Sequence, residues 1–333
     1  MKTRHEPLSE TLLGAPRRLV APLMGYPGIN ITNTSIKQNE FNWGVQFWTV
    51  SELVHEFRPD IAFFIMDLAV EASALGLPVR FPLLESPSVE YHLVKEVSDL
   101  QQFMACDILK DGRARTYIDT MKMMAMYLDT IPGAYCTGPF TLGGLMMGAN
   151  EIALATALDP EVVHRVLEVA TSVIVRYVKA LAQAGAKVLA VLEPTAVMLS
   201  PAAFEDFSGK YVRQVFAAAP GCVPVLHICG HSTHLLDRMV ETGAEGLSLD
   251  APIDFPAAAK ALPSNVALIG NVDPVSVMRD GRPSQVTEAV RQLSDAMGPW
   301  RNFILSTGCD LPPDTPLDNI RAFMDAGRRY GAL

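Results

Sequence analysis

Residues 159–192 read DPEVVHRVLEVATSVIVRYVKALAQAGAKVLAVL and contain one complete helix and strand. Asp159 and Pro160 are typical of a helix N-cap and first turn, and Gly185 is typical of the residue that ends a helix. The apolar side chains between them recur at helical spacing: Val162, Val163, Val166, Leu167, Ala170 and Val173. The run Val188–Leu192 is apolar throughout, as in a parallel strand covered on both faces. This stretch therefore predicts a helix packed on a buried parallel strand.

The same alternation extends along the chain. Short apolar runs that predict strands are Leu19–Leu23, Ile61–Met66, Gly133–Cys136, Val188–Leu192, Val223–Ile228, Gly246–Leu249, Val266–Ile269 and Phe303–Leu305. Asp273-Pro274 and Thr315-Pro316 are expected to open two further helices. Eight strand–helix alternations predict an α/β TIM (β/α)8 barrel, a single domain over residues 1–333, with an open doubly wound sheet as the alternative. Residues 81–109 contain no clear strand and are interpreted as a small insertion after the second strand that covers the barrel mouth.

Composition excludes several classes of function. The formal net charge is −9 and there is no run rich in Lys or Arg, so we expect no binding to nucleic acid or to an anionic membrane. No apolar run is long enough to span a bilayer. Five cysteines at irregular spacing give no disulfide framework, which favours reduced thiols in a cytoplasmic protein.

A histidine and two cysteines follow predicted strands where the chemistry of a barrel is found. His227 and Cys229 are two residues apart at the end of the fifth run, so their side chains point the same way. Cys309 follows the eighth run and Asp250 the sixth, and closure of a barrel brings these strand ends to one mouth. Imidazole and thiolate are ligands suited to zinc. The sequence predicts a zinc site with His227, Cys229, Cys309 and Asp250, with Asp250 alternatively supporting a ligand or capping a helix.

Two more polar residues follow predicted strands. Glu193 ends the fourth run and Asn271 the seventh. They are predicted as catalytic residues that contact substrate, with a structural hydrogen-bonding role as the alternative for each. Neither a phosphate-binding glycine loop nor a nucleophile elbow is present.

Three motifs carry a resemblance to a known family. They are His227-Ile-Cys-Gly230, Gly270-Asn-Val-Asp-Pro274 and Gly308-Cys-Asp-Leu-Pro-Pro-Asp-Thr-Pro316. They resemble the uroporphyrinogen decarboxylase superfamily, and more closely its corrinoid-dependent zinc methyltransferase branch, which includes methylcobalamin:coenzyme M methyltransferases. The resemblance implies zinc held by His227, Cys229, Cys309 and an acidic residue at Asp250, which is shorter than the glutamate frequent there. It also implies methyl transfer between a corrinoid carried by a partner protein and a small-molecule methyl donor or acceptor.

The chain departs from the decarboxylases of that superfamily. They carry an early arginine motif for substrate carboxylates, whereas the matching region Ala21–Asn30 contains no arginine. Methyl transfer is therefore the main predicted function, and a decarboxylase-like enzyme acting on a tetrapyrrole is kept as the alternative. A non-catalytic protein that holds a corrinoid or thiol on an inactivated barrel is a further alternative, against which the intact set of metal ligands argues.

Overall fold

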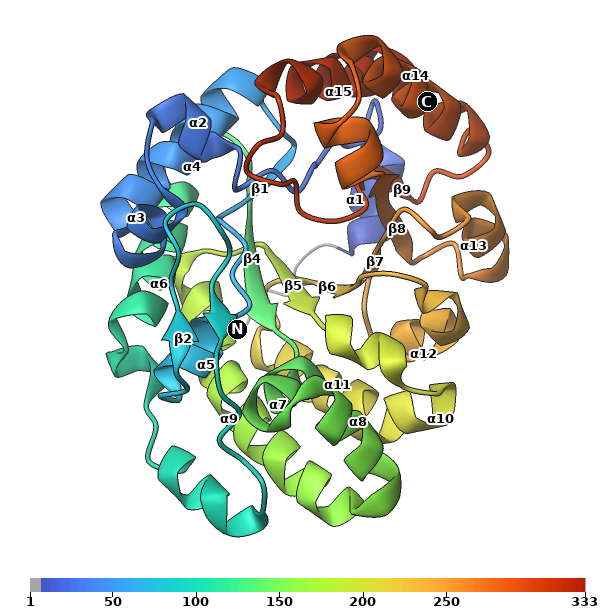
Figure 1. Ribbon diagram of the computed structural model, residues 1–333. Coiled ribbons are helices and arrows are strands. Elements are labelled where there is room, and N and C mark those ends of the chain that lie inside the picture. Colours follow the sequence, from blue (N-terminus) through green and yellow to red (C-terminus); the bar gives the residue numbers. More distant parts are fainter. Residues whose placement is uncertain (1–6, 333) are drawn as a thin grey trace.

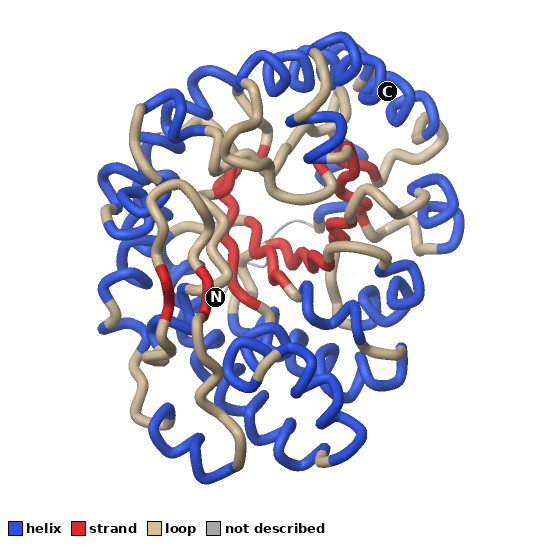
Figure 2. The backbone as a smooth tube through the Cα atoms, in the orientation of Figure 1, coloured by secondary structure: helices blue, strands red, loops and turns tan. Residues whose placement is uncertain are grey.

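A curled parallel sheet forms the centre of the protein, with helices around it (Figures 1 and 2). The computed structural model describes residues 7–332. Seven parallel strands are hydrogen-bonded in the order β1-β4-β5-β6-β7-β8-β9. Their bounds are β1 Ile61–Phe63, β4 Ile131–Thr137, β5 Val188–Leu192, β6 Val223–Ile228, β7 Gly246–Leu249, β8 Ala267–Val272 and β9 Phe303–Thr307. The predicted α/β barrel architecture is confirmed, and each of these strands overlaps a predicted run.

The first predicted run is the exception, because it forms a single bridge rather than a regular strand. Val20 is bridged to Leu305 of β9, and the N–H of Asp60 donates to the carbonyl of Val20 at 3.0 Å. The segment therefore lies between β9 and β1 and fills the seam of the ring. Pro22 lacks an N–H group and cannot extend the ladder. Side chains of β9 supply further hydrogen bonds to this segment: Ser306 Oγ donates to the carbonyl of Ala21, and the N–H of Leu23 donates to Thr307 Oγ1.

Fifteen α-helices are present among the described residues, most of them on the outside of the ring. They are α1 Leu8–Gly14, α2 Gly28–Thr32, α3 Ile36–Phe41, α4 Trp43–Phe57, α5 Val70–Ala74, α6 Gly112–Tyr127, α7 Pro139–Met147, α8 Ala149–Leu158, α9 Pro160–Ala184, α10 Pro201–Phe204, α11 Lys210–Ala218, α12 Leu236–Glu241, α13 Phe255–Ala261, α14 Pro283–Ala296 and α15 Leu317–Tyr330. Among them, no helix is long and apolar enough to cross a membrane.

The structure confirms the predicted helix ends, with one exception. Asp159 accepts a hydrogen bond from the N–H of Val162, and Gly185 ends α9 with φ +114°. Asp273 caps a short π-helical turn, η6 (Pro274–Arg279), through the N–H groups of Val275 and Ser276. Thr315 does not cap α15, since its buried hydroxyl has no hydrogen-bond partner and the helix begins one residue after Pro316.

The segment 81–109 contributes no strand to the barrel, as predicted. It includes β3 (Ser88–Val89), which pairs antiparallel with β2 (Val79–Arg80), and the 3₁₀ helix η1 (Val97–Phe103). The insertion is fixed at its start by Phe81, whose ring lies 4.4 Å from the guanidinium of Arg113. Arg113 in turn forms a buried ion pair with Asp67, which also accepts a hydrogen bond from the hydroxyl of Tyr117.

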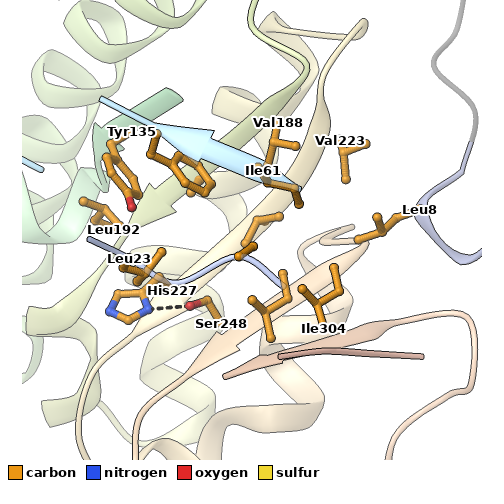
Figure 3. Close-up of a pocket in the computed structure, with 15 residues that line it drawn as sticks. Leu8, Leu23, Ile61, Tyr135, Val188, Leu192, Val223, His227, Ser248 and Ile304 are labelled. Carbon is orange, nitrogen blue, oxygen red and sulfur yellow. Dashed lines mark hydrogen bonds between the residues drawn. The ribbon is translucent and has the colours of Figure 1, made fainter. Parts of the chain in front are cut away.

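The interior of the barrel is apolar and nearly filled. Its free space of about 20 Å³ is roughly the room of one water molecule. The lining side chains come from every part of the ring and include Leu23, Ile61, Tyr135, Leu192 and Ile304 (Figure 3). Val225 of β6 and Ile269 of β8 also line this space. Because the interior is packed, binding and chemistry are confined to the mouth, where the strands end.

Candidate metal centre

His227, Cys229 and Cys309 meet at the mouth of the barrel. His227 lies on β6, Cys229 directly follows this strand, and Cys309 follows β9. The Nε2 atom of His227 is 2.9 Å from the Sγ of Cys229 and 3.7 Å from the Sγ of Cys309, and the two sulfurs are 3.4 Å apart. Among the described residues, these three form the one group of His, Cys, Asp or Glu side chains close enough to hold a single metal ion.

The separations can be compared with those around a bound ion. Tetrahedral zinc, with Zn–S near 2.3 Å and Zn–N near 2.0 Å, sets about 3.5–3.8 Å between neighbouring ligand atoms. The contacts of Cys309 with the other two ligands, at 3.4 and 3.7 Å, lie close to this range, whereas the His227–Cys229 contact is shorter. Two thiols and one imidazole converging at these distances fit a zinc ion with room for a further ligand.

His227 is held in one orientation by its neighbours. Its Nδ1 atom is 2.9 Å from Oγ of Ser248, its register partner on β7 (Figure 3). Its Nε2 atom faces the two sulfurs. Such a second hydrogen bond is the usual means of fixing the ring of a metal-binding histidine. Burial lowers the pKa of His227, but the hydrogen bond to Cys309 and the charges of Cys309, Asp250 and Asp310 outweigh it and raise the pKa overall.

The thiol of Cys309 is held in its protonated form when no cation is nearby. The hydrogen bond with Cys229 and then burial raise its pKa, against the lowering effect of His227. A metal ion reverses this balance because it stabilises the thiolate directly. Binding of a cation at these side chains would therefore release protons.

Asp250 is not brought into the ligand group. Its Oδ2 accepts a hydrogen bond from the N–H of Gly230 at 2.8 Å, and its Oδ1 accepts from the N–H of Ala251. The carboxylate thus holds the loop that directly follows Cys229. Asn271 fixes the loop after β7 that contains Asp250, because its amide group donates to the carbonyls of Asp250 and Ile253.

This geometry predicts a graded effect of Asp250→Asn. The amide retains one acceptor oxygen but cannot accept from both N–H groups, so the Gly230 loop should loosen while all three ligands remain. We expect one metal ion per chain, bound about 10- to 100-fold more weakly. Competition with a chromophoric chelator measures the affinity. Loss of metal as severe as in a ligand variant would instead make Asp250 a ligand.

Glu193 is completely buried, and its carboxylate is fully hydrogen-bonded within the protein. It accepts from the N–H groups of Phe140 and Thr141, in the first turn of α7, and from Oγ of Ser208. Burial raises its pKa against these hydrogen bonds. Through these contacts Glu193 fixes the start of α7. The predicted contacts of Glu193 and Asn271 with substrate remain predictions.

Two features of the site were not predicted. The first is Ser248, whose hydroxyl lies beside the ring of His227. The signal in the sequence was a single polar residue within the otherwise apolar run Gly246-Leu-Ser-Leu249. The second is a cavity of about 260 Å³ at the mouth, between segments that follow β1, β9 and the first run. It is lined by Tyr26, Met66, Leu68, Ser86, Pro87, Asp310, Leu311, Pro312 and Pro313. Ser86 and Pro87 belong to the insertion, which therefore covers part of the mouth, as predicted.

Comparison with known proteins places the chain in a family. The model of the uroporphyrinogen decarboxylase (URO-D) family matches residues 49–330. The chain belongs to the uroporphyrinogen decarboxylase family. It is 29% identical over 273 residues to the methylcobamide:CoM methyltransferase MtbA of Methanosarcina acetivorans, covering 79% of this chain and 78% of the relative. It is 24% identical over 321 residues to a uroporphyrinogen decarboxylase of Prochlorococcus marinus, covering 92% and 89%.

A solved structure of the same fold shows how complete the likeness is. A methyltransferase from Methanosarcina mazei superimposes with a TM-score of 0.86 at 22% sequence identity, covering 97% of this chain and 98% of that chain. Within the family, members named as methyltransferases and members named as decarboxylases are thus both related to this chain. The choice between the two activities depends on the residues at the mouth.

Proposed function

We propose that this family member is a zinc-dependent methyltransferase that moves a methyl group between a corrinoid protein and a small molecule. The observation that carries the proposal is the convergence of His227, Cys229 and Cys309 on one point at the barrel mouth. A ligand set of this kind leaves a position for an exchangeable group, which distinguishes a catalytic zinc site from a closed structural one. The relationship to MtbA supports the same activity.

Zinc bound there would lower the pKa of a coordinated thiol and so supply a thiolate at neutral pH. The protein's own groups prepare the site. Cys229 and Cys309 provide negative charge to hold the cation, and Ser248 fixes the ring of His227. The carboxylate of Asp250 fixes the loop after Cys229. The packed apolar interior beneath His227 keeps bulk water from the inner side of the site.

In the direction of a thiol acceptor, the reaction is a nucleophilic displacement. The thiolate attacks the methyl carbon, the S–C bond forms, and the electron pair of the cobalt–carbon bond stays with cobalt. A corrinoid is too large for the filled interior, so it is expected to approach the mouth from outside, carried by a partner protein. Because the site needs reduced thiols, we infer a cytoplasmic location.

Decarboxylation is less well supported by the mouth of this barrel. A substrate with several carboxylates requires cations, and none of the residues lining the mouth cavity is Lys, Arg or His. Arg113, close to this region, is already paired with Asp67. Decarboxylase chemistry also gives no reason for two thiols and an imidazole to converge.

Two measurements test the proposed function. Protein purified without chelators should contain about one zinc ion per chain. It should also demethylate methylcobalamin in the presence of 2-mercaptoethanol, with loss of the methylcobalamin absorbance and formation of the methyl thioether. The reverse direction is tested with reduced cobalamin and methyl ethers or methylamines. A protein that neither takes up zinc nor transfers methyl groups in either direction would refute the proposal.

A further inference from the structure

The two sulfurs of the metal centre lie close enough to react with each other. Sγ of Cys229 is 3.4 Å from Sγ of Cys309, although the two residues are 80 positions apart in the sequence. A disulfide bond holds its two sulfurs about 2.05 Å apart. The sulfurs therefore need to approach by roughly 1.4 Å, the difference between these two distances, for a bond to form.

Both cysteines lie beyond the regular part of their strands, where the backbone is free of the sheet ladder. Cys229 follows the last residue of β6, and Cys309 is two residues beyond the last residue of β9. Gly230, next to Cys229, has φ +75°, and a Cβ atom added there would meet no atom within 4 Å. The loop after β6 therefore has open space beside it, and the approach of the sulfurs requires no change in a strand.

The other cysteines of the chain are not arranged in this way. Cys136 and Cys222 are buried, whereas Cys229 and Cys309 are partly exposed. Cys106 is also partly exposed, but its thiol donates to a backbone carbonyl. Over residues 7–332, the contact between Cys229 and Cys309 is the one contact between two cysteine sulfurs. An oxidant that reaches the mouth of the barrel therefore meets a single pair of adjacent thiols.

We propose that Cys229 and Cys309 are a modification site, at which a peroxide joins them in a reversible disulfide that empties the metal centre. The bond consumes two of the three side chains that converge there and leaves His227 alone. The thiolate, and not the disulfide sulfur, is the form of cysteine that binds a metal. The proposal rests on the proposed function for the identity of the ion, but formation of the bond requires the two thiols alone.

Hydrogen peroxide supplies the oxidant in two steps. One sulfur attacks a peroxide oxygen, so the S–O bond forms, the O–O bond breaks, and the departing hydroxide takes the proton of that thiol as water. The second sulfur attacks the resulting sulfenic sulfur, so the S–S bond forms, the S–O bond breaks, and the hydroxyl group leaves with the second proton as water. The two sulfurs lose two electrons, which reduce one peroxide to two waters. The neighbour at 3.4 Å favours this second step over further oxidation, because the step is intramolecular.

The test treats the full-length, zinc-loaded protein with hydrogen peroxide. Free thiols counted under denaturing conditions should fall from five to three, and the intact mass should fall by two hydrogen atoms. A chromophoric chelator should record one zinc ion released for each two thiols lost, and a digest without reductant should contain the peptides of Cys229 and Cys309 joined. Dithiothreitol should restore five thiols and zinc binding. Thiol loss with a gain of oxygen, a bond to another cysteine, or a bond between two chains would overturn the proposal.

Two variants provide the controls. Cys106→Ser should still lose two thiols and its zinc, since Cys106 is not one of the three residues of the metal centre. Cys229→Ser leaves Cys309 without a partner, so peroxide should raise its mass by oxygen atoms and form no joined peptide. An internal bond at Cys309 in that variant would contradict the assigned pair.

The same oxidation of metal-free protein separates this inference from the proposed function. A Cys229–Cys309 bond in a protein that binds no zinc when reduced would refute zinc-dependent methyl transfer and leave the modification site in place. Zinc binding and methyl transfer by a protein that forms no such bond would refute the modification site alone.

Discussion

Cys309→Ser is expected to lose bound zinc and methyl transfer while the fold persists. The serine hydroxyl is a poor ligand compared with a thiolate, and Cys309 supplies two of the three contacts that define the metal centre. We expect zinc affinity to fall by more than 100-fold and activity to fall at least as far. The fold should persist because the site lies at the mouth and outside the packed interior. Metal analysis, a chelator-competition titration and circular dichroism measure these effects.

Cys106→Ser is the matched control for that variant. Cys106 is a half-buried thiol that donates to the carbonyl of Ala74 and is not one of the three residues that meet at the metal centre. Zinc content and activity should stay at the level of the unmodified protein. A Cys309→Ser protein that still carried a full equivalent of zinc would show that the third ligand has been assigned to the wrong residue.

Arg113→Leu is expected to destabilise the protein by about 3–5 kcal/mol, because it leaves the buried carboxylate of Asp67 without its cation. The same change removes the stack on Phe81 that holds the start of the insertion. The free energy of unfolding, measured with urea at neutral pH, gives the size of the effect. Arg115→Leu, at an exposed position on the same helix, should change it by less than about 0.5 kcal/mol.

A double variant separates the ion pair from packing. Asp67→Asn combined with Arg113→Leu removes both charges but retains an acceptor for the N–H of Ala69, which Asp67 holds at 2.8 Å. The double variant should be more stable than Arg113→Leu alone, since no unpaired charge remains. A double variant less stable than Arg113→Leu would assign the loss to the packing of the arginine side chain.

Local patterns predicted most of the fold. The caps of α9 and the bounds of β5, β6 and β7 depend on residues adjacent in sequence, and they were predicted to the residue. The meeting of His227, Cys229 and Cys309 was predicted because each lies at or just after the end of a strand, and ring closure brings these strand ends together. The first run was predicted too long, since its partners on β9 include the side chains of Ser306 and Thr307, which no apolar pattern reveals.

Long-range contacts between polar groups could not be predicted from the sequence. Whether Asp250 reaches a metal or the N–H of Gly230 depends on the exact path of a loop that belongs to another strand. The anchoring of α7 by Glu193 joins residues that lie 52 positions apart. The pairing of Arg113 with Asp67 spans 46 positions and arises only when α6 packs against α5 and β4. In each case the residue type was visible, but its partner was decided by the tertiary structure.

The position of the three ligands in the ring has a mechanical consequence. His227 and Cys229 belong to β6 and Cys309 to β9, and β7 and β8 separate these strands in the sheet. A bound ion therefore ties together two strands that share no hydrogen bond, and it does so next to the seam where the first run meets β9. Such an ion would hold the circumference of the barrel closed, and its removal by a chelator would loosen the ring first at that seam.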